Sequence, residues 1–383
     1  MMRQAIFIEA YGLACALGAD KDSVRDALFF AQTPSALARA ALTDGREVLV
    51  GRLPFVLESG SGTTRTNRLV AHCYNAIAAD VAAARERVGA HRLAVVIGTC
   101  TSGIGEVGER LKQKLSGGAW RVSLEQQLLD YPARHAVALS EAAGPCYAIS
   151  TACTSGARAL AAGARLIQAG LCDAVLCGGV DSLCELTLNG FAALESLSRA
   201  RCNPMSVNRD GINIGEACAL FLLSRAPSAY RLSGWGESAD AYHISAPDPQ
   251  GGAAEGALRK ALAHAGLAPS DIGFVHLHGT ATRLNDAMEA SVIHRLFGPE
   301  TPASSTKPLT GHTLGAAGAI QAAFCLMALE EKRLPPHWWD GALDPALPDI
   351  RLAAQGEALE GAHAVSANYA FGGNNAALVV SRA

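Results

Sequence analysis

The fold is decided by a stretch that reads Ile149-Ser150-Thr151-Ala152-Cys153-Thr154-Ser155-Gly156, in which a strand turns directly into a helix that we expect to end near Ala169. A second stretch repeats this design: Ser304-Ser305-Thr306-Lys307 leads through Thr310-Gly311-His312 into a helix expected to end near Glu331. Both helices open on glycine and alanine and carry few charges, which is typical of buried helices whose backbones approach closely. The repetition predicts a duplicated fold in which the two helices pack against each other.

Short apolar strands alternate with helical segments along the whole chain, which indicates an α/β fold. We expect buried strands at Arg92–Ile97 and Ala174–Cys177, and a helical segment over Asn67–Val88. The segment Gly234–Gly256 contains scattered Ser, Asp, Pro and Gly, which makes it the expected boundary between two parts of the chain. We therefore divide the chain into an N-terminal half, residues 1–233, and a C-terminal half, residues 234–383.

The composition indicates a large buried interior. Of the 383 residues, 17% are charged and 50% are hydrophobic, and the formal net charge is −3. A charged fraction below the roughly 25% of ordinary domains argues against disorder and favours an oligomer interface. A near-neutral chain offers no electrostatic surface for nucleic acid. The longest clearly apolar run, Ala322–Leu329, is far shorter than the roughly 18 residues that cross a membrane, so we expect no membrane segment.

The 11 cysteines predict a cytoplasmic protein with free thiols. Their number is odd and they form no Cys-x-x-Cys pair, which argues against a disulfide framework and a zinc site. A signal peptide is an alternative, because Ala5–Ile8 is apolar and Ala14-Cys15-Ala16 resembles a cleavage site. Glu9 and Tyr11 interrupt the apolar run, and a first strand over residues 4–9 fits it better.

Cys153 is the candidate nucleophile, because it lies where the first strand turns into the helix. A thiol at a helix N-terminus is expected to have a lowered pKa, and the unpaired backbone N–H groups there can stabilise an oxyanion. The alternative is that Cys153 is one more buried thiol.

Two histidines next to glycine, His278 and His312, are candidates for hydrogen-bond donors to an oxygen that gains charge during a reaction. Each of them alone could instead be structural. A metal site on His276 and His278 is a further alternative, but no cysteine or third histidine lies nearby at ligand spacing, and we expect no metal. Near the C-terminus, Phe371-Gly372-Gly373 suits either a mobile turn whose amides approach a ligand or an ordinary β-turn.

Together these motifs resemble the β-ketoacyl-acyl-carrier-protein synthases of the class I/II type, which are condensing enzymes of the thiolase-like superfamily. The resemblance covers essentially the whole chain. Its motifs, in the family's order and at its spacing, are Thr151–Gly156, His278–Thr282 with Asn285-Asp286, Lys307 with Gly311-His312, and Phe371–Gly373.

The resemblance implies a thiolase-like fold, with five layers of αβαβα built from two duplicated halves. It implies decarboxylative Claisen condensation of a malonyl thioester with a Cys-bound acyl chain, in fatty-acid, polyene or polyketide biosynthesis. Cys153 would be the nucleophile, His278 and His312 would stabilise the enolate, and Lys307 would hold the histidines. The backbone N–H groups of Cys153 and Phe371 would form the oxyanion hole, with Phe371-Gly372 as the gate to the acyl pocket.

No metal or redox cofactor is implied, because the substrates arrive on the phosphopantetheine of an acyl carrier protein. The acyl-pocket candidates are Ile104, Phe191 and Tyr369. The candidates for contact with the acidic carrier protein are Arg65, Arg68, Arg199 and Arg201. The implied assembly is a homodimer, or a heterodimer with a chain-length-factor-like subunit, without nucleic acid or membrane.

The chain also departs from the family pattern. Gln321 stands where the family often has a glutamate paired with the lysine, so the charge of Lys307 is expected to be balanced differently. The sequences around Thr66–Leu69, Ser206–Arg209 and Pro335–Trp338 are similar to those of synthases of bacterial aryl-polyene clusters.

Two other readings of the resemblance remain open. A non-catalytic chain-length-factor-like subunit would typically lack the nucleophile, whereas Cys153, His278, His312 and Lys307 are all present. A thiolase would have a second reactive cysteine near the C-terminus, and Phe371–Asn375 contains none.

Overall fold

The computed structural model describes residues 4–35, 37–58, 63–119 and 122–383. Its 10-stranded sheet consists of two blocks of five strands. The first block contains β1 (Phe7–Ala14), β4 (Leu93–Gly98), β5 (Cys146–Ile149), β6 (Ala174–Asp181) and β8 (Ala217–Ser224). The second block contains β9 (Tyr230–Ala239), β10 (Phe274–His276), β11 (Ala303–Ser304), β12 (His363–Ala370) and β13 (Asn374–Arg382).

The two blocks have the same topology. Counted along the chain, the strands of each block lie in the order third, second, fourth, fifth, first: β5-β4-β6-β8-β1 and β11-β10-β12-β13-β9. In both blocks the second strand pairs in parallel with the third and the fourth, and the other two pairings are antiparallel. The blocks meet where Phe7 of β1 pairs with Arg231 of β9. The shared order and directions confirm the predicted duplication.

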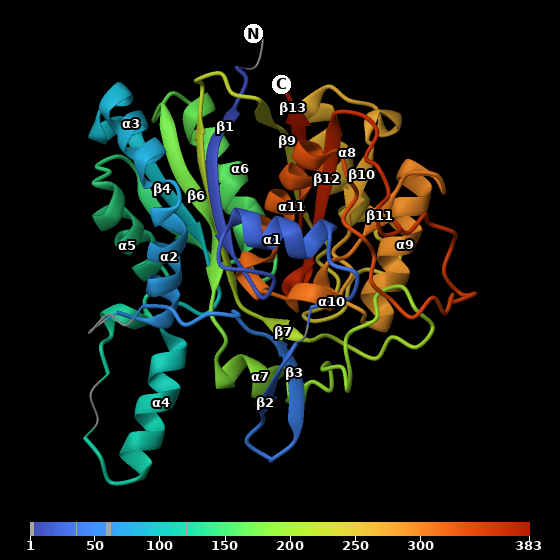
Figure 1. Cartoon of the computed structure of the whole chain (residues 1–383), viewed down its shortest axis with the longest axis horizontal. Helices are drawn as coiled ribbons and strands as arrows, with labels where there is room; N and C mark the ends of the chain where they lie inside the picture. Colours follow the sequence, from blue (N-terminus) through green and yellow to red (C-terminus); the bar gives the residue numbers. More distant parts are fainter. Residues whose placement is uncertain (1–3, 36, 59–62, 120–121) are drawn as a thin grey trace.

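Helices cover both faces of each block (Figure 1), so that the layers run αβαβα. The alternation of side chains along β8 shows why. Its Ala219, Phe221 and Leu223 join the central core, whereas Cys218 and Leu220 face the outer layer. The outer helices of the first block are α2 (Arg65–Asn75), α3 (Ala78–Val88) and α5 (Tyr131–Ser140); those of the second are α8 (Gly252–Ala265) and α9 (Arg283–Phe297). The central layer is formed by α6 (Ser155–Gln168) and α11 (Ala317–Glu331).

The remaining elements connect these layers. One end of the molecule, the lower end in Figure 1, carries α4 (Ile104–Leu115), α7 (Glu185–Ala193), and strands β2 (Ala38–Ala41), β3 (Glu47–Gly51) and β7 (Ile214–Gly215). These three strands form a separate small sheet in the order β2-β3-β7. The other helices are α1 (Lys21–Phe29) and the short α10 (Lys307–Thr310).

The two central helices approach each other as closely as the sequence predicts. A Cβ atom added to Gly156 of α6 would lie 2.9 Å from the backbone nitrogen of Ala319, and one added to Gly318 of α11 would lie 2.6 Å from the Cβ of Ala157. Among the described residues, the stretch Leu314–Glu331 is apolar and long enough to cross a membrane, but 89% of it is buried inside the protein. This stretch contains α11, and its apolar composition is that of a buried core helix packed against α6.

Of two expectations about segments, the first holds apart from a break, and the second is wrong for the first residues of its range. The helical segment expected over Asn67–Val88 is broken between α2 and α3, and the break leaves both Ile77 and Val81 buried. The expected boundary beginning at Gly234 is strand through Ala239.

The reason for the second error is that Gly234 and Gly236 provide close packing rather than a turn. A Cβ at these positions would lie 2.2 Å from the carbonyl oxygen of Ala261 and 2.0 Å from that of Ala257, both in α8. The division at residues 233 and 234, which falls within β9, stays a prediction.

The crossing predicts opposite effects for two glycine-to-alanine substitutions. Gly318→Ala places a methyl group against Ala157, and overpacking of this kind costs about 1–3 kcal/mol, so the thermal unfolding midpoint should fall by several degrees. Gly256→Ala in α8 is the matched control, because a Cβ there meets nothing within 4 Å, and alanine stabilises a helix by about 0.5–1 kcal/mol. Equal unfolding midpoints for the two variants would contradict the close crossing.

Candidate active site

Four segments from both halves of the chain meet at one cavity. Cys153 lies at the start of α6, His278 in the loop between β10 and α9, His312 between α10 and α11, and Tyr369–Phe371 where β12 ends. All of these residues line a cavity of about 280 Å³, together with Phe191. The structure therefore brings together the residues that the sequence placed on separate turns.

Hydroxyl groups hold the turn that carries Cys153. The Oγ of Ser155 accepts a hydrogen bond from the Thr151 nitrogen at 2.9 Å and donates one to the Ala152 carbonyl oxygen at 2.6 Å. Ala152 has a φ of 53°, a left-handed conformation that a non-glycine residue adopts at a cost. The small polar residues on either side of the cysteine thus compensate for a strained turn, and the cysteine side chain is only 8% exposed.

The two histidines surround the thiol. The Nε2 atom of His312 lies 2.9 Å from the Sγ atom of Cys153, and the ring of His278 meets that of His312 edge-on, with the centroids 5.3 Å apart. Both histidines are almost completely buried. Burial and the nearby Lys307 ammonium group keep the pKa of each imidazole well below its usual value, so both rings are neutral and each carries one N–H.

The thiol itself differs from the sequence-based expectation. Burial raises the pKa of Cys153 to about 11, although Lys307 and the backbone N–H groups of Cys153 and Phe371 act to lower it. The expected lowering by the helix N-terminus is therefore wrong for the free thiol, because desolvation of the thiolate is the larger effect. The two amides are the same pair that the resemblance names as the oxyanion hole, and both act on the sulfur.

The hydrogen-bond partners of the Lys307 ammonium group include no carboxylate among the described residues. Its Nζ atom donates to the carbonyl oxygen of His278, lies 3.5 Å from His278 Nδ1 and lies 3.4 Å from Gln321 Oε1. Within the part of the chain that the structure describes, no ion pair joins Lys307 to an acidic side chain. Burial lowers the pKa of this ammonium group below its usual range.

Gln321 explains why a glutamate is not needed at this position. Its amide nitrogen donates to the carbonyl oxygens of Leu277 at 3.1 Å and Ala367 at 3.0 Å, and its Oε1 accepts from Asn368 at 2.7 Å. An ionised carboxylate has no hydrogen to donate to the two carbonyl oxygens. Gln321 thus ties β10 to β12 while leaving the charge of Lys307 unpaired.

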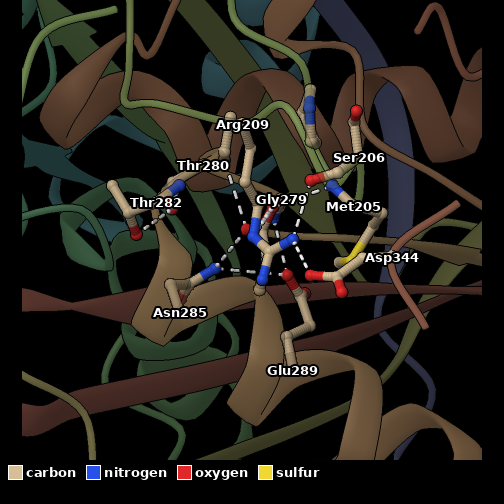
Figure 2. Close-up of polar contacts among 12 residues, drawn as sticks. Met205, Ser206, Arg209, Gly279, Thr280, Thr282, Asn285, Glu289 and Asp344 are labelled. Atoms are coloured by element: carbon tan, nitrogen blue, oxygen red, sulfur yellow. Dashed lines mark hydrogen bonds and ion pairs between the residues drawn. The ribbon is translucent and has the colours of Figure 1, made fainter. Parts of the chain in front are cut away.

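A buried polar network positions the loop of His278 (Figure 2). Glu289 accepts hydrogen bonds from the backbone nitrogens of His278 and Gly279, both at 2.6 Å. Asp286 accepts from the nitrogen of Ala281 at 3.2 Å, and Arg209 donates to Asp344 at 2.5 Å. Asp286 belongs to a motif visible in the sequence, whereas the only sequence signal for Glu289 and Arg209 is that they lie beside family-like motifs.

Of the residues predicted to form the gate and the acyl pocket, some line the cavity and one does not. The rings of Phe191 and Phe371 lie 5.8 Å apart in the cavity, and Phe371 is 38% exposed, which is compatible with a gate. Gly372 adopts a φ of 81°, which favours glycine. Ile104, at the start of α4, is not among the residues that line this cavity.

The four predicted arginines differ in what they contact. Arg65 forms two hydrogen bonds with the buried Glu216, at 2.8 and 2.6 Å, and Arg201 donates to the carbonyl oxygens of Ser35 and Pro308. These two guanidinium groups hold the protein's own loops. Arg68 has a buried Nε, and Arg199 is exposed. Arg283, which was not among the predicted arginines, is exposed and lines the cavity itself.

A metal site was considered for the histidines. His276 is turned away from the cavity, since its Nε2 lies 3.1 Å from Thr306 Oγ1 and β10 ends at this residue. Ligand atoms of Cys153, His278 and His312 do lie within 4.8 Å of one another, as a metal site requires. The ammonium group of Lys307, 3.5 Å from His278 Nδ1, repels a cation there, so we keep the prediction that the thiol acts as a nucleophile.

Comparison with known proteins gives a consistent family. The model of the β-ketoacyl synthase N-terminal domain matches residues 63–229, and that of the C-terminal domain matches residues 230–338. The chain is 31% identical to 3-oxoacyl-[acyl-carrier-protein] synthase 2 of Staphylococcus aureus, over 76% of this chain and 77% of that protein. It is 32% identical to the protein of the same name from Rhizobium meliloti, over 73% of this chain and 71% of that protein.

A solved structure is more similar still. A ketosynthase (ApeO) in complex with its chain length factor (ApeC) from Xenorhabdus doucetiae matches with a TM-score of 0.95 and 40% identity. The match covers 99% of this chain and 98% of that chain.

The charge of Lys307 predicts how the thiol responds to pH. Because the ammonium group favours the thiolate, Lys307→Met should raise the pKa of Cys153 further and slow its alkylation by iodoacetamide at pH 7, where Lys307 is charged, by about tenfold per pKa unit. The rate is followed by mass spectrometry of the peptide that contains Cys153. Lys114→Met, on the exposed part of α4, is the control, and an unchanged alkylation profile in Lys307→Met would contradict the assigned electrostatics.

Proposed function

The chain belongs to the β-ketoacyl synthase family, and we propose that it is a catalytic member in which Cys153 carries the acyl chain during condensation. Its fold is the thiolase-like fold of that family, and its activity is that of a condensing enzyme, an acyltransferase. One observation supports the role of Cys153 most strongly: its sulfur lies 2.9 Å from His312 Nε2 in the same cavity as His278.

In the first step, Cys153 takes the acyl chain from the thiol of a carrier's phosphopantetheine. The sulfur of Cys153 forms a bond to the thioester carbonyl carbon, and the bond from that carbon to the pantetheine sulfur breaks. The thiol proton leaves to solvent, and the departing pantetheine thiolate takes up a proton in its place. The N–H groups of Cys153 and Phe371 stabilise the oxyanion of the tetrahedral intermediate.

In the second step, a malonyl thioester enters the same cavity. His278 and His312, as neutral imidazoles, donate to its thioester carbonyl oxygen. The bond to the carboxylate carbon breaks, CO2 leaves, and the electron pair forms the enolate. The enolate carbon then attacks the acyl-Cys153 carbonyl; Cys153 leaves as a thiolate and regains a proton from solvent.

The alternatives are less compatible with this site. A chain-length-factor-like subunit without catalysis gives no reason to place a thiol 2.9 Å from one neutral histidine and a lysine 3.5 Å from the other. A thiolase needs a second reactive cysteine, and among the described residues Cys153 is the cysteine that lines this cavity.

For partners, we propose an acyl carrier protein and a second ketosynthase-like subunit. The 40% identical ketosynthase is in complex with its chain length factor, which favours a heterodimer over a homodimer. The resemblance of Thr66–Leu69, Ser206–Arg209 and Pro335–Trp338 to aryl-polyene synthases supports a role in polyene-type rather than housekeeping synthesis. We also propose a functional division into residues 1–233, which carry the nucleophile, and residues 234–383, which carry the two histidines.

The roles of Cys153 in the two steps can be separated. Cys153→Gln removes the acyl acceptor while keeping a polar side chain of similar reach, so condensation should be lost, whereas decarboxylation of malonyl-carrier should persist because His278 and His312 remain. The measurements are product formation and CO2 release. Cys146→Ala, at an exposed cysteine, is the control. Full condensation by Cys153→Gln would exclude the proposed nucleophile.

Arg283 provides a test of how the carrier arm enters. Arg283 is the first residue of α9, it is exposed, and it lines the cavity. Its guanidinium group can therefore form charge-assisted hydrogen bonds with the phosphate of phosphopantetheine. Arg283→Gln should lower kcat/KM about tenfold for an acyl-phosphopantetheine thioester and leave it unchanged for the acyl-pantetheine thioester, which lacks phosphate. Arg199→Gln, outside the cavity lining, is the control. Equal losses with both thioesters would contradict phosphate recognition.

A further inference from the structure

The hydroxyl group of Tyr369 is buried in the catalytic cavity without a hydrogen-bond partner among the described residues. The side chain is 4% exposed, and its ring meets that of His278 edge-on with the centroids 5.9 Å apart. Buried hydroxyl groups are nearly always hydrogen-bonded, because leaving one unpaired costs about 1–3 kcal/mol. An unpaired donor beside the reacting groups therefore points to a ligand.

The strand that carries Tyr369 fixes this placement. Tyr369 pairs with Asn375 in the regular antiparallel ladder between β12 and β13, two residues before Phe371. Its backbone needs nothing from the hydroxyl group. Phenylalanine would fill the same apolar space, so the packing does not account for the oxygen atom.

The neighbouring acidic groups do not satisfy the hydroxyl group. Glu289, on α9, uses its oxygens to accept the backbone N–H groups of His278 and Gly279 (Figure 2). Burial raises the pKa of Tyr369 well above the usual value, and the charges of Glu289, Asp240 and Glu255 raise it further. The group therefore stays protonated and can act as a donor.

We propose that the Tyr369 hydroxyl group donates a hydrogen bond to the carboxylate of the malonyl extender thioester, and so selects extender units over acyl thioesters that lack a carboxylate. This inference rests on the proposed function. His278 and His312 hold the thioester carbonyl oxygen, and the carboxylate carbon is two bonds away from the carbonyl carbon. A neutral hydroxyl group binds an anion through a charge-assisted hydrogen bond without adding a charge to the cavity.

Tyr369→Phe tests the proposal, since it removes only the oxygen. The KM for a malonyl thioester in decarboxylation should rise about tenfold, while the rate of acyl transfer to Cys153 from an acyl thioester stays unchanged. Because no bond to the protein is lost, the unfolding midpoint should stay the same or rise. A structural role for the hydroxyl group predicts the reverse: a lower midpoint and equal losses in both reactions.

Tyr11→Phe is the matched control. Tyr11 is also buried, but its hydroxyl group donates to Glu330 at 2.7 Å, so its loss should lower the unfolding midpoint and leave the KM for the malonyl thioester unchanged. If Tyr369→Phe keeps the wild-type KM for the malonyl thioester, the proposal is overturned. If wild type itself releases no CO2, the proposed function fails instead, so the two failures are distinguishable.

Discussion

The close crossing of α6 and α11 is the constraint on which the rest of the structure depends. Glycine and alanine at Gly156, Ala157, Gly318 and Ala319 leave no room for larger side chains between the two backbones. Each helix follows a turn that lines the cavity, and the crossing therefore fixes the 2.9 Å distance between Cys153 and His312. The two strand blocks and the outer helices bury this crossing, and the duplicated topology places one such turn from each half at the same cavity.

Burial sets the electrostatics of the site. It keeps the histidines neutral and the free thiol protonated, and the unpaired charge of Lys307 together with two backbone amides counteracts its effect on the thiol. The buried acidic groups beneath the His278 loop are satisfied by backbone N–H groups rather than by Lys307. Gln321 also bonds to the backbone rather than pairing with a charge, because its amide can donate to two carbonyl oxygens, which an ionised carboxylate cannot do.

The sequence predicted the duplication, the two central helices and the residues around the cavity, because motif spacing and small-residue runs are local signals. It misjudged Gly234 and Gly236, since glycine indicates a turn and a close packing contact alike. It predicted a lowered pKa for Cys153 because a helix terminus is visible in a sequence, whereas the depth of burial is not. It could not tell that Arg65 is held by Glu216, that Arg283 lines the cavity, or that the Tyr369 hydroxyl group lacks a partner, because each depends on segments distant in the chain.

The central claim is that Cys153 carries the acyl chain, and mass spectrometry of the protein after incubation with an acyl-carrier thioester tests it most directly. The account predicts an added acyl mass on the peptide that contains Cys153, which disappears when malonyl-carrier is supplied, together with a β-ketoacyl product two carbons longer. An acyl group on a different residue would contradict the account. So would a Cys153 that stays unmodified while the product still forms.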